Sequence, residues 1–181
     1  MKSIKRYETI INEALRAALE YDTPEGQINE FISFFGKHIG SDRIYIFEDD
    51  EEHHVTNNTY EWCAEGITPQ IEHLQGVNME VIDWWYDTFD EGKSVIISDV
   101  EELKGVHQVS YNMLKYQNVH KVVVSPLRHK GQIKGFFGVD NPPAVDYNAL
   151  TMFLDMIGTM LISLLKIRNT FQKEQYNASM S

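Results

Sequence analysis

The chain has 181 residues, a mass of 21.0 kDa and 43% hydrophobic residues, a composition typical of one ordinary globular domain. Its 16 Lys and Arg residues against 27 Asp and Glu residues give a formal net charge of −11, which argues against nucleic acid or an anionic membrane as a main partner. The single cysteine, Cys63, excludes an internal disulfide and a thiolate metal cluster, and it fits a reducing compartment.

The first 20 residues do not form a signal peptide, because polar residues such as Glu8 and Arg16 interrupt every apolar run. The most apolar stretch, residues 150–167, carries Asp155 and Lys166, so it favours a helix of a globular domain over a membrane span. We therefore expect a cytoplasmic chain with no membrane segment of its own.

Two helices are predicted at the start of the chain. Apolar residues spaced three and four apart, among them Ile11, predict a helix over residues 3–20 with a narrow, coiled-coil-like seam. A second helix follows Thr23, a good N-cap, with Pro24 in its first turn, and it extends to about His38.

The middle of the chain is predicted to be rich in strands. We expect a hairpin, a loop with a short helix, an aromatic-rich helix, a strand, a partly helical segment and a second hairpin. The first hairpin covers residues 43–48 and 53–62, the loop with its short helix covers 66–76, and the aromatic-rich helix covers 79–89. The strand covers 93–100, the partly helical segment 101–118, and the second hairpin 119–127 and 132–140.

A long helix closes the chain, from Asp146 as its N-cap to residue 169 or beyond. It carries two adjacent apolar stripes, one of which can cover the domain's own sheet. The second stripe needs another partner, which could be the N-terminal helix, a second subunit or both. We predict a homodimer through the terminal helices, with an interface formed by Ile11, Leu154, Ile157, Leu161 and Leu164.

This order of elements predicts an α+β domain, because hairpins dominate and helices flank them. The sheet should be mainly antiparallel, with about 5–6 strands and with helices on both faces. We divide the chain into an N-terminal dimerisation helix (1–22), a core domain (23–145) and a C-terminal helix (146–181).

Residues 23–165 resemble a GAF domain, a small-molecule sensor fold related to PAS domains. The strings that carry the resemblance include DRIYIFE, TYEWCAEG and GFFGVDNP. The last two are similar to GAF domains that precede diguanylate cyclase (GGDEF) domains in bacterial signalling proteins. The resemblance implies a GAF/PAS-like fold and a regulatory role in cyclic-di-GMP signalling, with an output domain expected after residue 181. The chain contains no GGDEF sequence, so we expect no cyclase chemistry within it.

The resemblance also implies a ligand pocket on one sheet face, roofed by residues 66–89 and 99–118. Bilin-binding GAF domains use a cysteine in this region, but residues 101–118 contain none. GAF-type methionine sulfoxide reductases cycle through several cysteines, and the chain has one. The pattern of the cyclic-nucleotide-binding GAF domains is also missing. We therefore predict an unidentified small molecule as the ligand, with no cofactor and no metal.

Aromatic residues are the first candidates for this pocket. Trp84 and Trp85 could form a stacking wall, although neighbours in a helix point about 100° apart and plain core packing against the sheet is the favoured interpretation. Tyr45, Tyr60 and Trp62 could share one sheet face, either as a ligand floor or as core residues with internal hydrogen bonds.

Three polar or amphipathic residues complete the predicted ligand site. Asp99 could accept hydrogen bonds from a ligand, or it could cap the turn that follows it. His107 and Tyr111 are placed beside the roof, where a lone histidine offers no metal-ligand spacing.

No nucleophile, general base or phosphate-binding glycine loop stands out, so we predict no catalytic residues and no enzyme. The leading hypothesis is a sensor that transmits a ligand-dependent change through its terminal helices. The alternative is a constitutive dimerisation module with a filled pocket.

Overall fold

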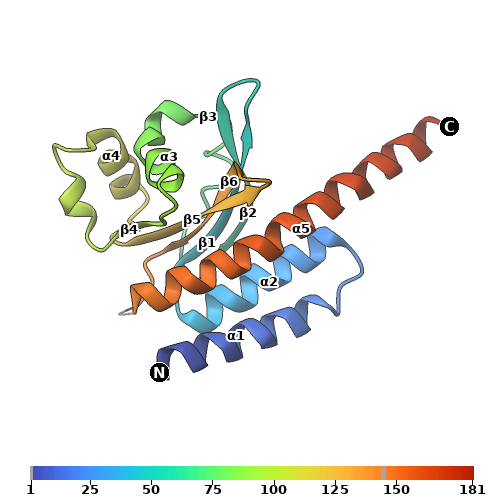
Figure 1. Ribbon diagram of the computed structural model, residues 1–181, viewed down its shortest axis with the longest axis horizontal. Coiled ribbons are helices and arrows are strands. Elements are labelled where there is room, and N and C mark those ends of the chain that lie inside the picture. The colour runs from blue at the N-terminus through green and yellow to red at the C-terminus, as the bar shows by residue number, and fades with distance from the viewer. Residues whose placement is uncertain (1, 144–145) are drawn as a thin grey trace.

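A computed structural model describes residues 2–143 and 146–181 of the chain (Figure 1). One six-stranded sheet forms its centre, and every pairing in it is antiparallel, in the order β3-β2-β1-β6-β5-β4. The strands are β1 (Arg43–Asp50), β2 (Val55–Cys63), β3 (Val77–Asn78), β4 (Val95–Ile97), β5 (Val122–His129) and β6 (Gln132–Asp140). The predicted α+β class and antiparallel sheet are confirmed.

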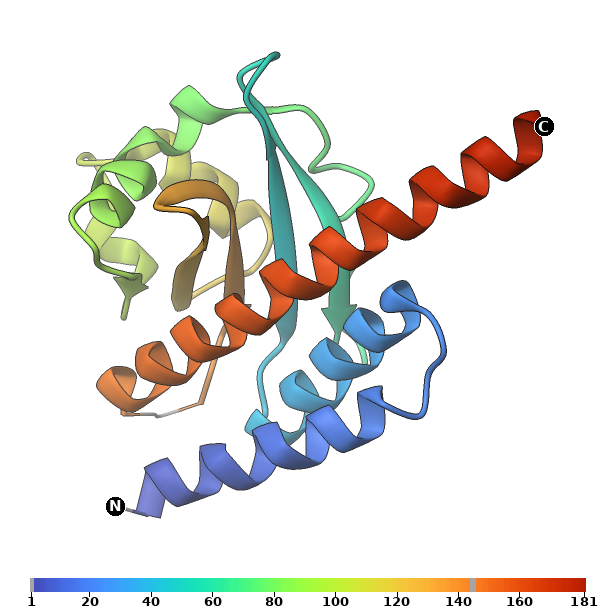
Figure 2. The same cartoon turned by 45° about the vertical axis from the view of Figure 1, so that its right-hand side comes forward.

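Helices cover both faces of this sheet (Figures 1 and 2). Helices α2 and α5 lie on one face with α1 packed outside them, while α3 and α4 lie on the other face. The helices are α1 (Lys2–Ala18), α2 (Pro24–Ile39), α3 (Asp83–Asp90), α4 (Gln108–Tyr116) and α5 (Tyr147–Met180), with 3-10 helices η1 (Met79–Ile82) and η2 (Val100–Leu103).

Local sequence explains where the terminal helices begin. The Thr23 hydroxyl accepts a hydrogen bond from the Gly26 amide at the start of α2, and the Asp146 carboxylate does the same for the Ala149 amide at the start of α5. Both predicted caps are confirmed. Helix α5 continues to Met180, in agreement with the prediction of a helix to residue 169 or beyond.

The loop over residues 66–76 differs from the prediction, because it contains turns and no helix. Gly66 and Gly76 have left-handed backbones (φ +80° and +60°), and Pro69 donates no amide hydrogen bond between them. The loop leads into β3, a two-residue edge strand that the sequence pattern did not reveal.

The sheet separates two hydrophobic cores. The first lies between the sheet and α1, α2 and α5, and the second lies between the sheet and α3 and α4. By length and composition alone, α5 could cross a membrane, but Leu150, Leu154 and Leu161 are fully buried in the first core. The prediction that one stripe of α5 covers the domain's own sheet is therefore confirmed.

Candidate functional site

A small pocket lies in the second core, between the sheet and α3 and α4. It encloses about 40 Å³, and its apolar wall comes from both sides: Tyr45, Phe47, Trp85, Met113, Leu114 and Phe136. A more polar hollow of about 360 Å³ adjoins it near the 66–70 loop, and the two spaces share Arg43 and Gln117. The inner pocket therefore has a neighbouring outer space from which a small molecule could enter.

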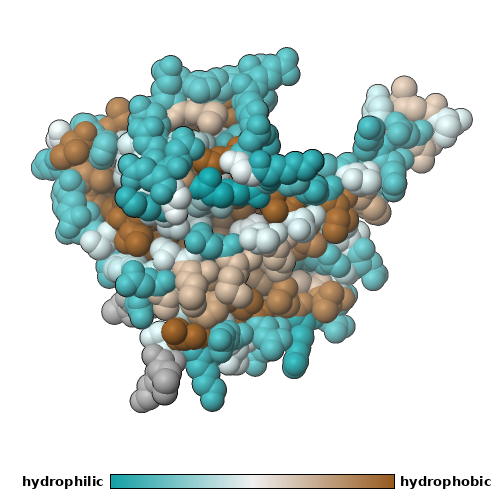
Figure 3. Space-filling view, in the orientation of Figure 1, coloured by the Kyte–Doolittle hydropathy of each residue, from teal (hydrophilic) through white to brown (hydrophobic). Residues whose placement is uncertain are grey.

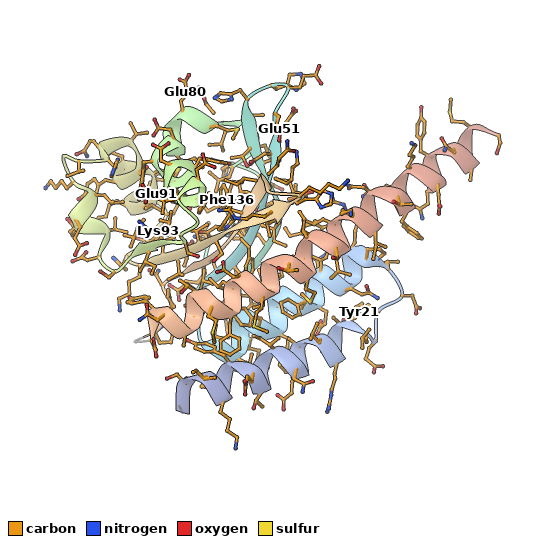
Figure 4. The ribbon with its side chains drawn as sticks, viewed as in Figure 1. Tyr21, Glu51, Glu80, Glu91, Lys93 and Phe136 are labelled. Carbon is orange, nitrogen blue, oxygen red and sulfur yellow. The ribbon has the colours of Figure 1, made fainter. Side chains whose placement is uncertain are left out.

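Four aromatic rings form a continuous wall of the inner pocket. The Phe47 and Phe136 rings stack with centroids 4.7 Å apart, and Trp85 meets Phe136 edge to face at 5.5 Å. Tyr45 meets Phe47 edge to face at 5.6 Å. Figure 4 labels Phe136, which lies between the sheet and α3. Such rings offer flat, polarisable surface to a bound molecule.

Tyr45 can occupy this wall because its neighbour on β6 is a glycine. A Cβ atom at Gly138 would lie 2.2–2.5 Å from the outer ring atoms and hydroxyl of Tyr45. The two residues are paired across β1 and β6. The missing side chain at Gly138 therefore sets the position of the Tyr45 ring.

Buried charges line the polar end of the pocket. The Arg43 Nη1 donates to Asp140 Oδ2 at 2.6 Å, and Nη2 donates to the Thr68 carbonyl at 2.9 Å. The Glu61 carboxylate lies 3.6 Å from Arg43 Nε and accepts hydrogen bonds from the backbone amides of Gln70 and Ile71. The Arg43, Glu61 and Asp140 side chains are each only 3% exposed. One guanidinium thus faces two carboxylates away from bulk water.

Three buried polar atoms of pocket-lining residues have no hydrogen-bond partner within the described chain. They are the Arg43 Nε, the Trp85 Nε1 and the Asp140 Oδ1. An unpaired buried polar atom costs about 1–3 kcal/mol, so such atoms are uncommon without a functional or solvent partner. The Trp85 Nε1 and the Asp140 Oδ1 are therefore available to a molecule in the pocket, while the Arg43 Nε faces Glu61 at 3.6 Å.

Burial dominates the protonation of these groups. It raises the pKa of Asp140 to about 6, even though Arg43 opposes the shift. Burial and the Asp140 charge also raise the pKa of Tyr45 well above its usual value. At the nearby end of β2, burial and Glu61 raise the pKa of the Cys63 thiol to about 11, so its reactive thiolate is disfavoured.

The end of β1 connects the pocket roof to α5. The Tyr86 hydroxyl of α3 donates to Asp49 Oδ1 at 2.7 Å, while Arg168 of α5 binds both carboxylate oxygens of Glu48 at 2.7 and 2.8 Å. Arg168 also donates to the Tyr60 hydroxyl at 3.3 Å. Consecutive residues of a strand point to opposite faces of the sheet. Asp49 therefore reaches α3 on one face, and Glu48 reaches α5 on the other.

The structure brings some of the predicted site residues to the pocket. Tyr45 and Trp85 line it. Trp84 and His107 instead stack on each other at 4.3 Å in an outer groove, where the Trp84 Nε1 donates to the Ser110 hydroxyl. Tyr111 packs against the second core and donates to Glu101 at 3.2 Å.

Other predicted residues lie elsewhere. Tyr60 and Trp62 belong to the opposite sheet face, since they pair with Ile46 and Ile44 while Tyr45 pairs with Glu61. The expectation that all three aromatic residues share one face is therefore corrected. Asp99 caps η2 by accepting from the Glu101 amide at 2.9 Å, as the capping alternative has it.

The predicted dimer interface also requires correction. Leu154, Ile157 and Leu161 are 0–2% exposed within the chain itself, so they are not free to contact a partner. Ile11 and Leu164 are partly buried against the same core. These side chains stabilise the packing of the terminal helices on the sheet.

Sequence reasoning missed Arg43, Glu61 and Asp140. Each is a charged residue at or near the end of a strand, which is the one signal that the sequence offered. Their meeting depends on the pairing of Arg43 with Asp140, which joins strands 97 residues apart. The described residues contain no cluster of His, Cys, Asp and Glu that could hold a metal ion.

No protein-family model and no curated protein sequence matches the chain. Solved structures, in contrast, match nearly all of it. The GAF domain of a phosphoenolpyruvate-protein phosphotransferase from Coxiella burnetii is 10% identical, with a TM-score of 0.73 over 94% of this chain and 98% of that chain. The phycocyanobilin-bound GAF domain of a cyanobacterial phytochrome is 16% identical, with a TM-score of 0.69 over 92% and 96%.

A third match is the free methionine-R-sulfoxide reductase of Neisseria meningitidis, in complex with its substrate. It is 11% identical, with a TM-score of 0.67 over 92% of both chains. At these identities the likeness concerns the fold. The chain has the GAF fold, with a curled antiparallel sheet and a long C-terminal helix.

Proposed function

We propose that the chain is a regulatory sensor domain that binds a small molecule between the sheet and helices α3 and α4. The observation that carries this proposal is the set of unpaired buried atoms on Arg43, Trp85 and Asp140 in one aromatic pocket. Free donors and acceptors beside apolar walls are the usual composition of a ligand site. The neighbours with bound bilins and a bound substrate support a small-molecule role for this fold.

A tetrapyrrole does not fit this pocket as it stands. The free space of about 40 Å³ has room for about three waters, and Phe47, Trp85 and Phe136 occupy the rest of the region. Cys63 lies at the end of β2 with a raised pKa, so it is poorly suited to attack a bilin or a sulfoxide. A smaller ligand and a non-catalytic role follow as proposals.

The signal would pass to α5 through the end of β1. Movement of α3 would pull on Asp49 through Tyr86, and the adjacent Glu48 holds Arg168. Arg168 is the last buried residue of α5, since every residue from 169 to 181 is exposed. A ligand that binds one arrangement of the roof more tightly would thus shift the free end of α5.

Helix α5 extends away from the core toward the C-terminus (Figure 1). We propose that it leads to an output domain such as a diguanylate cyclase, on the basis of the TYEWCAEG and GFFGVDNP strings. A cytoplasmic, cyclic-di-GMP-linked role for the domain belongs to the same proposal.

A homodimer through the terminal helices remains part of the proposal, on a different surface. Four exposed side chains lie along one side of α5: Met152, Met156, Ile167 and Phe171. They are separated by four or eleven residues, which is close to one or three full turns of a helix. On α1, Ile4 and Leu15 are exposed with the same spacing. Figure 3 shows apolar atoms gathered along α5 and beside α1 on this face.

The constitutive dimerisation module is the second candidate, favoured by the small size of the inner pocket. A thermal-shift screen against common metabolites separates the two. A ligand at about 100 times its Kd should raise the Tm by roughly 5–10 °C. We expect a selective hit that Trp85→Phe weakens and Trp84→Phe leaves unchanged. A flat screen, with no ligand retained in native mass spectrometry, would favour the dimerisation module.

A further inference from the structure

The charges around the inner pocket do not balance. Arg43 supplies one positive charge, while Glu61 and Asp140 supply two negative charges, and all three side chains are buried. Burying an unmatched charge is costly, and the raised pKa of Asp140 is the expected consequence. A bound cation would balance the second negative charge.

The hydrogen bonds indicate that such a cation would bind at one oxygen of Asp140. Asp140 Oδ2 already accepts from Arg43, but Oδ1 has no partner within the described chain. The Tyr45 hydroxyl is placed to donate to this carboxylate and Glu61 also faces it, but neither group supplies a positive charge. Both Arg43 Nη atoms are used, by Asp140 and by Thr68. The remaining guanidinium N–H, Nε, faces Glu61 at 3.6 Å, so no cationic donor reaches Asp140 Oδ1.

The walls suit an organic cation better than a metal ion. The rings of Tyr45, Phe47, Trp85 and Phe136 line the pocket, and aromatic rings attract a desolvated organic cation. The described residues offer no cluster with the ligands that a metal requires.

The unpaired Trp85 Nε1 adds a second requirement. An indole N–H can only donate, so its partner must be an oxygen or another acceptor. The volume limits the buried part of the ligand to a few non-hydrogen atoms.

We propose that the inner pocket binds the ammonium end of a short-chain amine that also carries a hydroxyl or carbonyl oxygen. This inference rests on the proposed function and names the ligand class of the same site. The ammonium donates to Asp140 Oδ1, and the oxygen accepts from Trp85 Nε1. Any larger remainder of the molecule extends into the adjoining hollow beside Gln117.

Three probes of four non-hydrogen atoms test the two requirements separately. Ethanolamine has both groups, n-propylamine lacks the oxygen, and ethylene glycol lacks the charge. Their Kd values are measured on the full chain by NMR titration, with the Trp85 indole N–H as reporter. We expect ethanolamine to bind at least tenfold more tightly than ethylene glycol, because a hydrogen bond between charged groups is stronger than one made by a neutral hydroxyl.

Two variants test which residue is responsible for each binding preference. Asp140→Asn should abolish the preference for the amine over the glycol, while Asp99→Asn, at a capping residue outside the pocket, should keep it. Trp85→Phe should reduce the ratio of ethanolamine to n-propylamine affinity at least threefold, with the backbone amides of Leu74 and Val77, which line the pocket, as reporters. Should Asp140→Asn fail to fold, lowering the pH of the wild type from 7.5 to 5 should weaken only the amines.

Equal affinity for ethanolamine and ethylene glycol would overturn the inference while leaving a ligand site in place. The absence of a saturable shift with any of the three probes would also overturn it, and the metabolite screen then judges the proposed function independently.

Discussion

Arg168 holds Glu48 through two hydrogen bonds of 2.7 and 2.8 Å, which join the last buried position of α5 to the end of β1 across 120 residues of sequence. The next residue of the strand, Asp49, holds Tyr86 of the pocket roof at 2.7 Å. This adjacency is the physical basis for coupling between the pocket and α5, since no other described residue of β1 makes a side-chain hydrogen bond to a helix.

Removing the α5 end of this connection should destabilise the domain. Arg168→Met leaves Glu48 partly buried without its cation, so we expect the free energy of unfolding to fall by about 2 kcal/mol. Lys166→Met removes an exposed charge from the same helix and should change stability by no more than about 0.5 kcal/mol. Urea unfolding of both variants measures the difference, and equal values would deny Arg168 an anchoring role.

Two glycine substitutions should have opposite effects. Gly138→Ala places a Cβ atom within 2.5 Å of the Tyr45 ring, so we expect a loss of about 1–3 kcal/mol. Gly158→Ala lies inside α5, where its Cβ atom would meet its nearest neighbours at an ordinary 3.5 Å, and should stabilise by about 0.5–1 kcal/mol. Thermal and urea unfolding report both changes. A neutral Gly138→Ala would show that Tyr45 has room to move.

Asp140 should make stability depend on pH. Its pKa rises from 3.8 to about 6 on folding, so between these values the folded chain binds more protons than the unfolded chain. Stability from this group is therefore complete below about pH 4 and is lost as the pH rises through about 6. The difference in unfolding free energy between wild type and Asp140→Asn isolates the effect from other carboxyl groups. As the pH rises from about 4 through about 6, the wild type should lose stability relative to Asp140→Asn. A difference in unfolding free energy that does not change with pH would contradict the raised pKa.

The proposed dimer should depend on exposed side chains of α5. Ile167→Glu combined with Phe171→Glu should give folded monomers, because both side chains are exposed in the single chain. Leu161→Glu should instead unfold the domain, since Leu161 is fully buried. Sedimentation velocity and circular dichroism distinguish the results. A dimer that survives the double substitution would exclude this stripe as the interface.

Much of the fold could be predicted from local patterns. Thr23 and Asp146 mark helix starts by their own side chains, and the apolar stripe of α5 records the face that meets the sheet. These signals lie within a few residues of the elements that they define.

The site depended on strand pairing that no local pattern contains. The sharing of a face by Tyr45 and Glu61, with Tyr60 on the other face, follows from the register of β1 and β2. The Arg43–Asp140 pair similarly requires β1 to lie beside β6. The resemblance led us to expect a pocket between the sheet and the segments that contain α3 and α4, where a small pocket lies. The individual charged residues could be found only from the three-dimensional arrangement.

The most direct test of coupling between roof and helix is hydrogen exchange in Tyr86→Phe. This change removes one hydroxyl from the roof, and Tyr86 has its hydrogen bond with Asp49 rather than with α5. Tyr111→Phe is the matched control, since it removes a roof hydroxyl bound to Glu101. We expect faster amide exchange in α5 around Arg168 for Tyr86→Phe and no such change for Tyr111→Phe. Faster exchange confined to α3 would contradict it.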